Sequence, residues 1–428
     1  GKLDNLNIIN TASGVSRSFN FSDKSDVFTS LADAGTSSAG KLTVVGFTDG
    51  TSYSTINAAG HSLFDISTPG ATVELDNTKV TNAAFVANIA SGNNLILDNS
   101  FIDASNTLGI TNNGTLTLKN ANTVNKAVTG SGTTNVTSGT TTLGANLTQN
   151  NLNISSGASL VNNASISAVL DNDGTLSNSG SFTANNGSSN DGGISGSGTL
   201  NIAGTFSNNA SLAQGTLNFT SGATLNTADD KSIVVSNITN DLNGGLFNAD
   251  NSKFNNYSVG KAALASALNI AIDMSISDHT ADTFTLSSGD AGSGNFNISA
   301  LDISAADQAA FRANTESVSV SQKILNNANT NTRLSISDDV IAAYDIAIDD
   351  ETVHGTTTFS GNSIDFNADY GDYEFTRSRA TSMSVSGSAD GLADTINWAI
   401  SVSDGTKSYT GKLDNLNIIN TASGVSRS

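Results

Sequence analysis

The feature that most constrains this fold is a strand-like phrase, Gly-Thr-Leu-x-apolar, which returns between residues 71 and 227. Asn/Gly turns separate these phrases from related segments of alternating polarity, and neighbouring segments lie roughly 16 to 24 residues apart. That period is expected when each coil of a solenoid contributes two or three short strands with their turns. The clearest segments are 72–75, 94–97, 114–118, 152–154, 174–176, 198–202 and 215–219.

Alternation by two gives each segment one apolar face, because successive side chains of a strand point to opposite sides of the sheet. Leu116 and Leu118 are expected on one face, with Thr117 on the other. The pattern predicts an all-β fold, a right-handed parallel β-helix (solenoid), with minor helical or loop decorations.

Charge is nearly absent from the regular stretch. Between Asp103 and Asp171 the only ionisable side chains are Lys119 and Lys126. Equivalent positions of stacked coils lie about 4.8 Å apart, so a repeated charge would face its own copy at short range. Neutral Asn, Ser and Thr can instead form hydrogen-bonded ladders along the stack. Candidate ladder residues are Asn112-Asn113, Asn150-Asn151, Asn162-Asn163, Asn185-Asn186 and Asn208-Asn209.

Three regions are predicted ahead of the C-terminal segment 411–428. Residues 1–70 carry more aromatic residues and are expected to form irregular β coils, and residues 71–227 form the regular solenoid. Residues 228–410 are expected to be C-terminal β coils with a short helical insertion at 305–313, where Ser304 is a suitable N-cap. No Pro-rich or Gly/Ser linker precedes this part, which favours a continuous rod over a separate β domain.

Residues 1–18 recur letter for letter as residues 411–428. The chain therefore contains one unit of 410 positions (411 − 1) and the start of the next, and we expect a longer tandem array. The repeated segment is predicted to form the coil that seals one unit onto the next. The assembly residues would be Leu3, Leu6, Ile8 and Ile9, with their copies Leu413, Leu416, Ile418 and Ile419.

Composition excludes several classes of partner. The formal charge of −20 disfavours nucleic acid and anionic membranes, since neither gains from meeting a negative surface. No apolar run approaches the roughly 20 residues that span a bilayer, so direct membrane insertion is not expected. The absence of Cys suits an extracellular protein of the bacterial cell surface, which must cross an oxidising space without forming stray disulfides.

The coils resemble the passenger β-helices of bacterial autotransporters and filamentous-haemagglutinin-type adhesins. The resemblance rests on the Gly-Thr-Leu-x-apolar coils and on the succession of segments 268–273, 279–286 and 294–298, in which an acidic strand, a Thr-Ala-Asp turn and a Gly-Asn-apolar strand follow one another. It implies secretion across a Gram-negative envelope and a role in adhesion or surface coating. The chain departs from that family in its long-period exact repeat and in lacking the C-terminal membrane barrel.

No residue pattern typical of catalysis is found. His61, His279 and His354 lie outside any nucleophile-elbow or HExxH context, so we expect no enzyme, no catalytic residue and no cofactor. The alternative from a different class is a glycan-degrading β-helix enzyme, which needs acids or Arg clustered on one wall. Arg is missing between Arg17 and Arg312.

Structural calcium is a minority hypothesis at two acidic turns. Asp171-Asn172-Asp173-Gly174 places two carboxylates at a glycine turn, and Asp369-Tyr370-Gly371-Asp372 is a looser oxygen cluster. Neither turn matches an EF-hand or a calcium-binding nonapeptide repeat, so the sequence assigns no metal site.

These observations favour a structural cell-surface β-solenoid, one unit of a repetitive extracellular adhesin or fibre. Its expected partners are identical units end to end, and host or cell-surface glycans that hydrogen-bond the exposed Thr and Asn rows. A rival within the structural class is a subunit that self-assembles non-covalently into a filament or surface layer.

Overall fold

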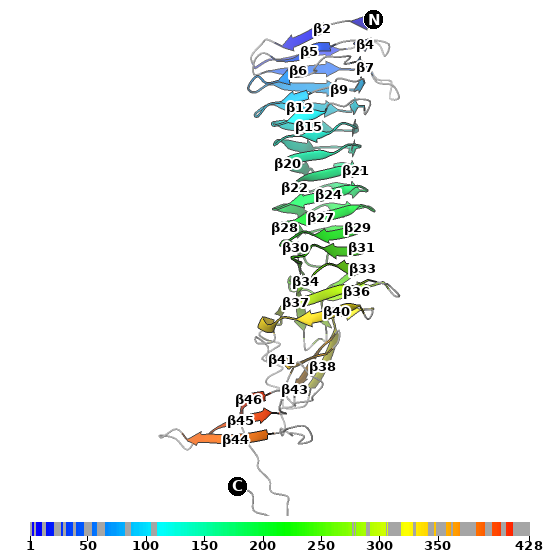
Figure 1. The fold of residues 1–428 in the computed structure, drawn as a ribbon. Coiled ribbons are helices and arrows are strands. Elements are labelled where there is room, and N and C mark those ends of the chain that lie inside the picture. The colour runs from blue at the N-terminus through cyan, green and yellow to red at the C-terminus, as the bar shows by residue number, and fades with distance from the viewer. Residues whose placement is uncertain are drawn as a thin grey trace, which may run out of the picture.

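The computed structural model describes side chains for residues 14–20, 40–46, 66–80, 87–103, 109–275, 278, 280–287, 292–304, 306, 323–327 and 331–340, and only the backbone of further strands. The described chain is an all-β parallel solenoid of about ten turns, as the sequence predicts. Its strands stack one above another along a single rod (Figure 1). The right-handed sense of the coil stays a prediction.

Each regular coil has three strands, so the solenoid has three faces, here called faces 1, 2 and 3. Face 1 is a parallel ladder in which each strand pairs with its equivalent in the next coil. Its strands are β3 (Ser16–Asn20), β6 (Lys41–Val45), β9 (Thr72–Asp76), β12 (Asn94–Asp98), β15 (Thr115–Lys119), β18 (Thr133–Val136), the ends of β20 (Leu147–Ile154) and β22 (Ser165–Asn172), β25 (Ser188–Asn190), β28 (Thr205–Asn208), β30 (Ala223–Thr227), β32 (Gly245–Asn248), β34 (Leu268–Ser275), β37 (Gly294–Asp302) and β40 (Thr332–Ile336).

Face 2 follows face 1 in each coil and is also a parallel ladder. Its strands are β1 (Lys2–Leu3), β4 (Val27–Phe28), β7 (Ser54–Asn57), β10 (Thr78–Thr81), β13 (Phe101–Ile102), β16 (Asn122–Val124), β19 (Thr140–Leu143), β21 (Ser159–Asn162), β23 (Thr175–Asn178), β26 (Gly193–Ser195), the starts of β29 (Ser211–Phe219), β31 (Ile233–Asn240) and β33 (Asn256–Leu264), β36 (Thr283–Leu286) and β39 (Leu325–Asn326).

Face 3 closes each coil. Its strands are β8 (Asp65–Ile66), β11 (Ala87–Ile89), β14 (Ile110–Asn112), β17 (Val128–Thr129), the starts of β20 and β22, β24 (Ser181–Asn185), β27 (Thr199–Ala203), and the ends of β29, β31 and β33. A further parallel pair, β2 (Leu6–Asn10) with β5 (Leu31–Thr36), contacts this face through β8.

The coil repeat is 18 residues where the solenoid is most regular. Thr133 pairs with Thr115 on one side and with Asn151 on the other, 18 residues away in each direction (133 − 115 and 151 − 133). Asn172, Asn190 and Asn208 keep the same spacing. Towards the C-terminus the coils lengthen, and the paired residues Asn269 and Asn297 are 28 apart.

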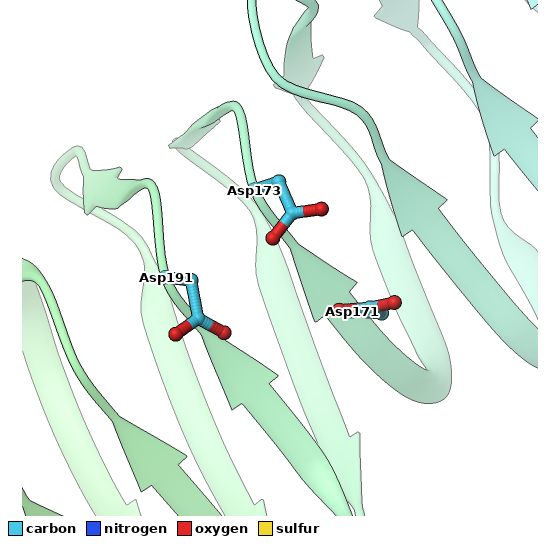
Figure 2. A group of neighbouring side chains, drawn as sticks. All are labelled: Asp171, Asp173 and Asp191. Carbon is cyan, nitrogen blue, oxygen red and sulfur yellow. The ribbon is translucent and has the colours of Figure 1, made fainter.

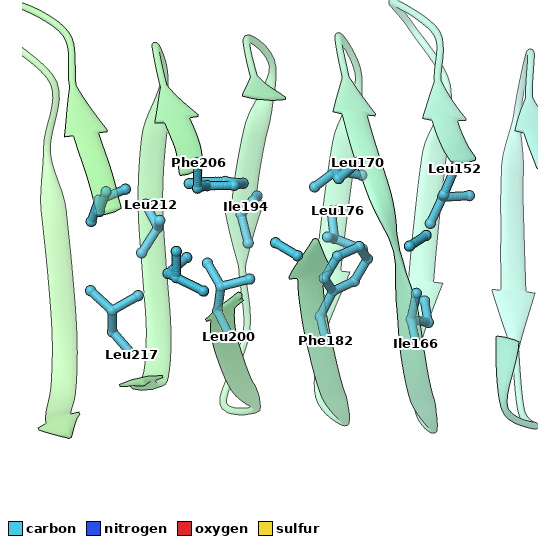
Figure 3. Packing of buried hydrophobic residues seen from close by; sticks show 14 of the residues in the cluster. Leu152, Ile166, Leu170, Leu176, Phe182, Ile194, Leu200, Phe206, Leu212 and Leu217 are labelled. Atoms are coloured by element: carbon cyan, nitrogen blue, oxygen red, sulfur yellow. The ribbon is translucent and has the colours of Figure 1, made fainter. Parts of the chain in front are cut away.

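The core is a single continuous cluster that runs along the interior of the coils. Each strand sends alternate side chains inward, so β15 reads half-buried, buried, half-buried, buried, half-buried along its five residues. In consecutive coils these inward side chains lie in rows, with Ile166, Phe182, Leu200 and Leu217 stacked at one strand position (Figure 3). The expectation for Leu116 and Leu118 is confirmed, since both are fully buried.

Aromatic side chains cluster in the interior of the longer C-terminal coils. Phe219, Phe247, Tyr257, Phe284 and Phe296 are buried and form a chain of ring contacts with centroid distances of 4.9 to 6.3 Å. Tilted and edge-on rings of this kind pack favourably beyond the area that they bury. Aromatic side chains therefore share the core of the C-terminal coils with Leu268, Ile270 and Ile298, which are also buried.

Further strands complete the described chain. β35 (Thr280–Ala281) forms an antiparallel hairpin with β34. A four-stranded sheet contains β38 (Val318–Lys323), β41 (Ile346–Ala347), β42 (Thr357–Ser360) and β43 (Ser363–Ala368). A three-stranded antiparallel sheet contains β44 (Ser382–Ala389), β45 (Ile396–Ser403) and β46 (Ser408–Leu413). The helical insertion predicted over 305–313 lies outside the described residues except for Ala306, which is helical.

The first copy of the duplicated segment contributes β1, β2 and the start of β3. These strands pair in parallel with β4, β5 and β6, and the coil repeat here is 25 residues, as between Lys2 and Val27 (27 − 2). In the second copy, Lys412 and Leu413 belong to β46 and pair antiparallel with Ala399 and Trp398. The same residues therefore form two different kinds of backbone pairing within this chain.

Candidate functional site

Buried amides form a column at the corner between face 1 and face 2. Asn172 Nδ2 donates to Asn190 Oδ1 over 2.6 Å, and Asn190 Nδ2 donates to Asn208 Oδ1 over 2.8 Å. All three side chains are completely buried. The column begins at Asn172 because the preceding coil places Ile154 at the paired position, which leaves Asn172 Oδ1 without a donor.

A second arrangement of buried amides involves an asparagine, a glycine and a glutamine in three consecutive coils. Asn178 Nδ2 donates to Gln214 Oε1 over 2.8 Å, although the two residues are two coils apart. Gly196 occupies the coil between them, with φ of +127° and room for no side chain, since a Cβ there would lie 2.2 Å from the carbonyl oxygen of Asn178. The glycine leaves the corner open, and the long glutamine side chain spans it.

The same arrangement occurs at a different corner of the solenoid. Asn112 Nδ2 donates to Gln149 Oε1 over 2.6 Å, and Gly130, with φ of +113°, lies between them. This copy follows a strand of face 3, whereas the copy at Asn178 follows a strand of face 2. The same Asn–Gly–Gln arrangement therefore occurs at two different corners of the coil.

The predicted Asn pairs are ladder residues in part. Within them, Asn112, Asn162 and Asn208 make buried amide contacts, Asn162 donating to Asn178 Oδ1 over 2.8 Å. Asn113 and Asn209 instead bond exposed neighbours, Ser131 and Asp191. The sequence missed Asn172 and Asn190 of the column, and Asn178, because each ends a strand as a single Asn. The available signal was that each lies about one coil from its amide partner.

Outward-facing amides form shorter ladders on the solvent side of the wall. Each pair joins the same position of adjacent coils through a half-buried side-chain hydrogen bond of 2.8 to 3.0 Å. The pairs are Asn135 with Asn153, Asn201 with Asn218, Asn226 with Asn248, and Asn269 with Asn297. Because their outer sides reach solvent, these rows present hydrogen-bonding groups to whatever meets the wall.

The acidic turn at Asp171 and Asp173 gains a third carboxylate from the next coil. Asp171, Asp173 and Asp191 lie on neighbouring coils with one oxygen of each within 4.8 Å of the others (Figure 2). All three are exposed, and two of them already accept side-chain hydrogen bonds, Asp171 from Ser189 and Asp191 from Asn209. The turn at Asp369 and Asp372 lies outside the described residues.

A second group of three carboxylates differs in burial. Asp250, Asp273 and Asp302 also offer oxygens within 4.8 Å of one another, and here Asp273 is only 3 % exposed. β34 and β37 bring the group together, since Asp273 and Asp302 are register partners. The sequence analysis missed this group because the coils that hold it have unequal lengths. The signal was an aspartate at the end of each face 1 segment, after Ala249, Ile272 and Leu301.

Hydrogen bonds fix the buried carboxylate of Asp273. Its Oδ2 accepts the backbone N–H of Asn251 over 2.7 Å and that of Lys253 over 3.3 Å. Its Oδ1 is buried and has no hydrogen-bond partner. Burial raises the pKa of Asp273, the backbone donors lower it, and the charge of Asp250 raises it further.

Asp282 adjoins this group and is completely buried. Its Oδ2 accepts the backbone N–H of Asp273 over 2.9 Å, and its Oδ1 accepts that of Asn255 over 2.8 Å. Burial raises the pKa of Asp282 to about 7 in spite of these two donors, which act in the opposite direction. The C-terminal coils thus hold closely spaced carboxylates, of which Asp273 and Asp282 are buried.

Glu74, by contrast, is a buried acid with cations beside it. It is 7 % exposed, and its carboxylate bonds Lys41 Nζ on one side and Lys119 Nζ, at 3.3 Å, on the other. Burial raises the pKa of Glu74, but the hydrogen bond and charge of Lys41, followed by those of Lys119, outweigh it and leave the pKa below its ordinary value.

We expect Glu74→Gln to destabilise the protein at pH 7 by about 1 to 2 kcal/mol, because it leaves two half-buried lysines without their anion. The folded pKa of Glu74 lies below its unfolded value of 4.5, so its contribution is fully present above pH 4.5 and is lost as the pH falls through the folded pKa. The stability difference between the parent and the variant, followed by urea unfolding, should therefore shrink below about pH 4.

Asp229→Asn is the matched control for this experiment. Asp229 is exposed and forms no ion pair among the described residues. Its loss is expected to change the stability by less than about 0.5 kcal/mol. An effect of Glu74→Gln no larger than that of Asp229→Asn, or one unchanged between pH 7 and pH 3, would contradict the structural role of Glu74.

The remaining predicted residues are placed only in part. Leu3 lies in β1, Leu6, Ile8 and Ile9 lie in β2, and Leu413 lies in β46. The others lie outside the described residues: Leu416, Ile418, Ile419, His61, His279, His354, Asp349 and Asp350. Their predicted roles stay predictions.

No helix among the described residues is long and apolar enough to cross a membrane. Comparison with protein families, with curated proteins and with solved structures finds no match for this chain. The class that the geometry defines is therefore the parallel β-solenoid, and function has to be argued from its surfaces and its repeat.

Proposed function

We propose that this chain is a structural cell-surface β-solenoid, one unit of a repetitive extracellular adhesin or fibre. The observation that carries the proposal is that the first copy of the duplicated segment supplies strand residues to all three sides of the coil. It contains β1, β2 and the start of β3, and each of these strands pairs in parallel with the strand one coil further on. A segment with a strand for every side of a coil can continue a solenoid from one unit into the next.

The hydrogen-bonded stack supports a mechanical role. In the coils from β15 to β30, backbone ladders and side-chain amides join neighbouring coils, and salt does not screen such neutral contacts. The Asn and Thr rows on the outside supply neutral hydrogen-bonding groups, which suit neutral glycans better than nucleic acid or anionic lipid. In this proposal the chain acts at the bacterial cell surface, binds its own kind end to end, and has no catalytic activity.

The end-to-end joint is tested by linking two units so that residues 411–428 of the first serve as residues 1–18 of the second. We expect the thermal midpoint of the linked pair to exceed that of a single unit, because two exposed coil ends become one covered joint. Removing residues 411–428 from a single unit should shorten the particles that it forms, as measured by electron microscopy.

A pair of variants isolates the predicted sealing coil. Ile8→Asp places a charge at one of the predicted assembly residues, and the matched Asn7→Asp places the same charge at the neighbouring position, which is not one of them. Only Ile8→Asp should abolish the gain from linking two units. Equal behaviour of the two variants, or no gain from linking in the parent, would count against the joint.

The two rival functions have their own measurements. Mass under denaturing conditions separates a covalent array from a filament of assembled subunits, since only the array keeps its length. Sugar release by the purified chain, compared with His279→Ala and Asp349→Ala variants, tests the glycan-degrading alternative. Release that either variant abolishes would replace the structural proposal with an enzymatic one.

A further inference from the structure

We propose that Asp250, Asp273 and Asp302 bind one calcium ion, which joins three successive coils at the C-terminal part of the solenoid. These residues come from the segment after β32, from β34 and from β37, the equivalent strands of face 1 in consecutive coils. One carboxylate oxygen of each lies within 4.8 Å of the others. The ion would therefore contact every coil of the group at once.

The buried oxygen of Asp273 is the independent sign of a ligand. Oδ2 is engaged by the N–H groups of Asn251 and Lys253, whereas Oδ1 is buried and has no donor. A buried carboxylate oxygen without a partner is costly, since it has lost water and gained nothing in exchange. Oδ1 is thus the oxygen of Asp273 that is left to meet a cation between Asp250 and Asp302.

The charge balance points the same way. Within the described residues, none of the three carboxylates forms an ion pair. The buried Glu74, by comparison, contacts two lysines from neighbouring coils. Asp76 and Asp98 also stack as register partners, but Lys119 occupies the same position in the next coil. Three stacked aspartates that include a buried one and have no basic partner carry uncompensated charge, which a bound cation would compensate.

The donor set suits calcium better than magnesium. Calcium bonds oxygen at about 2.3 to 2.6 Å and so can bridge any oxygens that lie within 4.8 Å of one another, as these do, whereas magnesium demands near-ideal octahedral geometry. Calcium also accepts six to eight oxygen ligands in irregular geometry, so water can complete a site with two exposed carboxylates. Carboxylate-only donor sets suit such hard cations and disfavour zinc or copper.

Calcium titration of the chelator-treated full chain tests the site. By calorimetry we expect a saturable site of one ion per chain, and calcium should raise the thermal midpoint relative to EDTA. Hydrogen exchange should slow at the amides of Asn251 and Lys253, which bond Asp273. Asp250→Asn and Asp302→Asn, both at exposed positions, should each weaken calcium binding about tenfold or more without unfolding the protein.

Asp191→Asn is the matched control, because it removes one carboxylate from the fully exposed group Asp171, Asp173 and Asp191. It should leave the affinity and the thermal shift unchanged. Equal loss in Asp191→Asn and Asp302→Asn would show diffuse screening rather than a site, and no saturable binding in the parent would overturn the proposal. If Asp273→Asn stabilises the chain in EDTA and calcium has no effect on the parent, Asp273 is a protonated carboxylic acid and not a calcium ligand.

Discussion

Replacing Gly192 with alanine is expected to destabilise the solenoid by at least about 3 kcal/mol, an effect at the upper end for single overpacking substitutions. A Cβ at this position would lie 1.8 Å from the carbonyl oxygen of Gly174 in the neighbouring coil. The obstacle is backbone, so no rotamer change can relieve it. The coils would have to separate locally, which breaks the 2.7 Å bond from Gly192 N to the carbonyl oxygen of Asn172.

The adjacent Gly193 supplies the matched control. A Cβ there meets only Ser211 Oγ at 3.5 Å, an ordinary van der Waals contact. Neither glycine has a left-handed φ, so the two substitutions hardly differ in backbone strain. They differ in the space that the neighbouring coil leaves for a Cβ atom. Gly193→Ala should be neutral to within about 1 kcal/mol, since alanine also reduces the freedom of the unfolded chain.

Urea unfolding of the full chain and hydrogen exchange of the amides in β23 and β26 measure this difference. Gly192→Ala should lower the unfolding midpoint and speed exchange in these two strands first, because the clash lies between their coils. A Gly192→Ala protein as stable as Gly193→Ala would mean that the coils are not as closely stacked as the ladder requires.

Much of this architecture could be predicted from the sequence, because the signals are local. Leu116 and Leu118 alternate with polar residues, and such alternation specifies a strand with one buried face. The recurrence of similar strands at nearly constant spacing then specifies a solenoid rather than a sandwich. The scarcity of charge between Asp103 and Asp171 follows from the same stacking, since equivalent positions lie about 4.8 Å apart.

The amide contacts at the corners and the acidic group could not be predicted without knowing which residues of successive coils are paired. The sequence indicates this register less clearly than it indicates the strands. Asn172 and Asn190 are isolated residues whose partnership depends on 18 residues forming one full turn. Asp250 and Asp273 meet only because the intervening coil is longer, and Asp302 joins them across a register shift between Ile270 and Ala271. A one-residue error in such an alignment turns every side chain to the opposite face.

The second large effect is expected for Asn190→Ala, at about 3 kcal/mol. Asn190 accepts from Asn172 and donates to Asn208 Oδ1, for which no other donor is recorded. Its removal leaves a fully buried amide oxygen without a partner and breaks the column in the middle. The cost combines the lost hydrogen bonds with the desolvation of a polar atom that cannot reach water.

Asn201→Ala separates this burial effect from the loss of an asparagine as such. Asn201 also has two side-chain partners, accepting from Asn218 and donating to Ser181, but it lies on the outer, half-buried side of the wall. Water can replace both bonds there, so the expected loss is below about 1 kcal/mol. Unfolding midpoints of the two variants decide the matter: equal losses would show that the buried column adds nothing beyond the outer ladders. A larger loss at Asn190 would make interior amides, rather than surface ladders, the polar element that holds these coils in register.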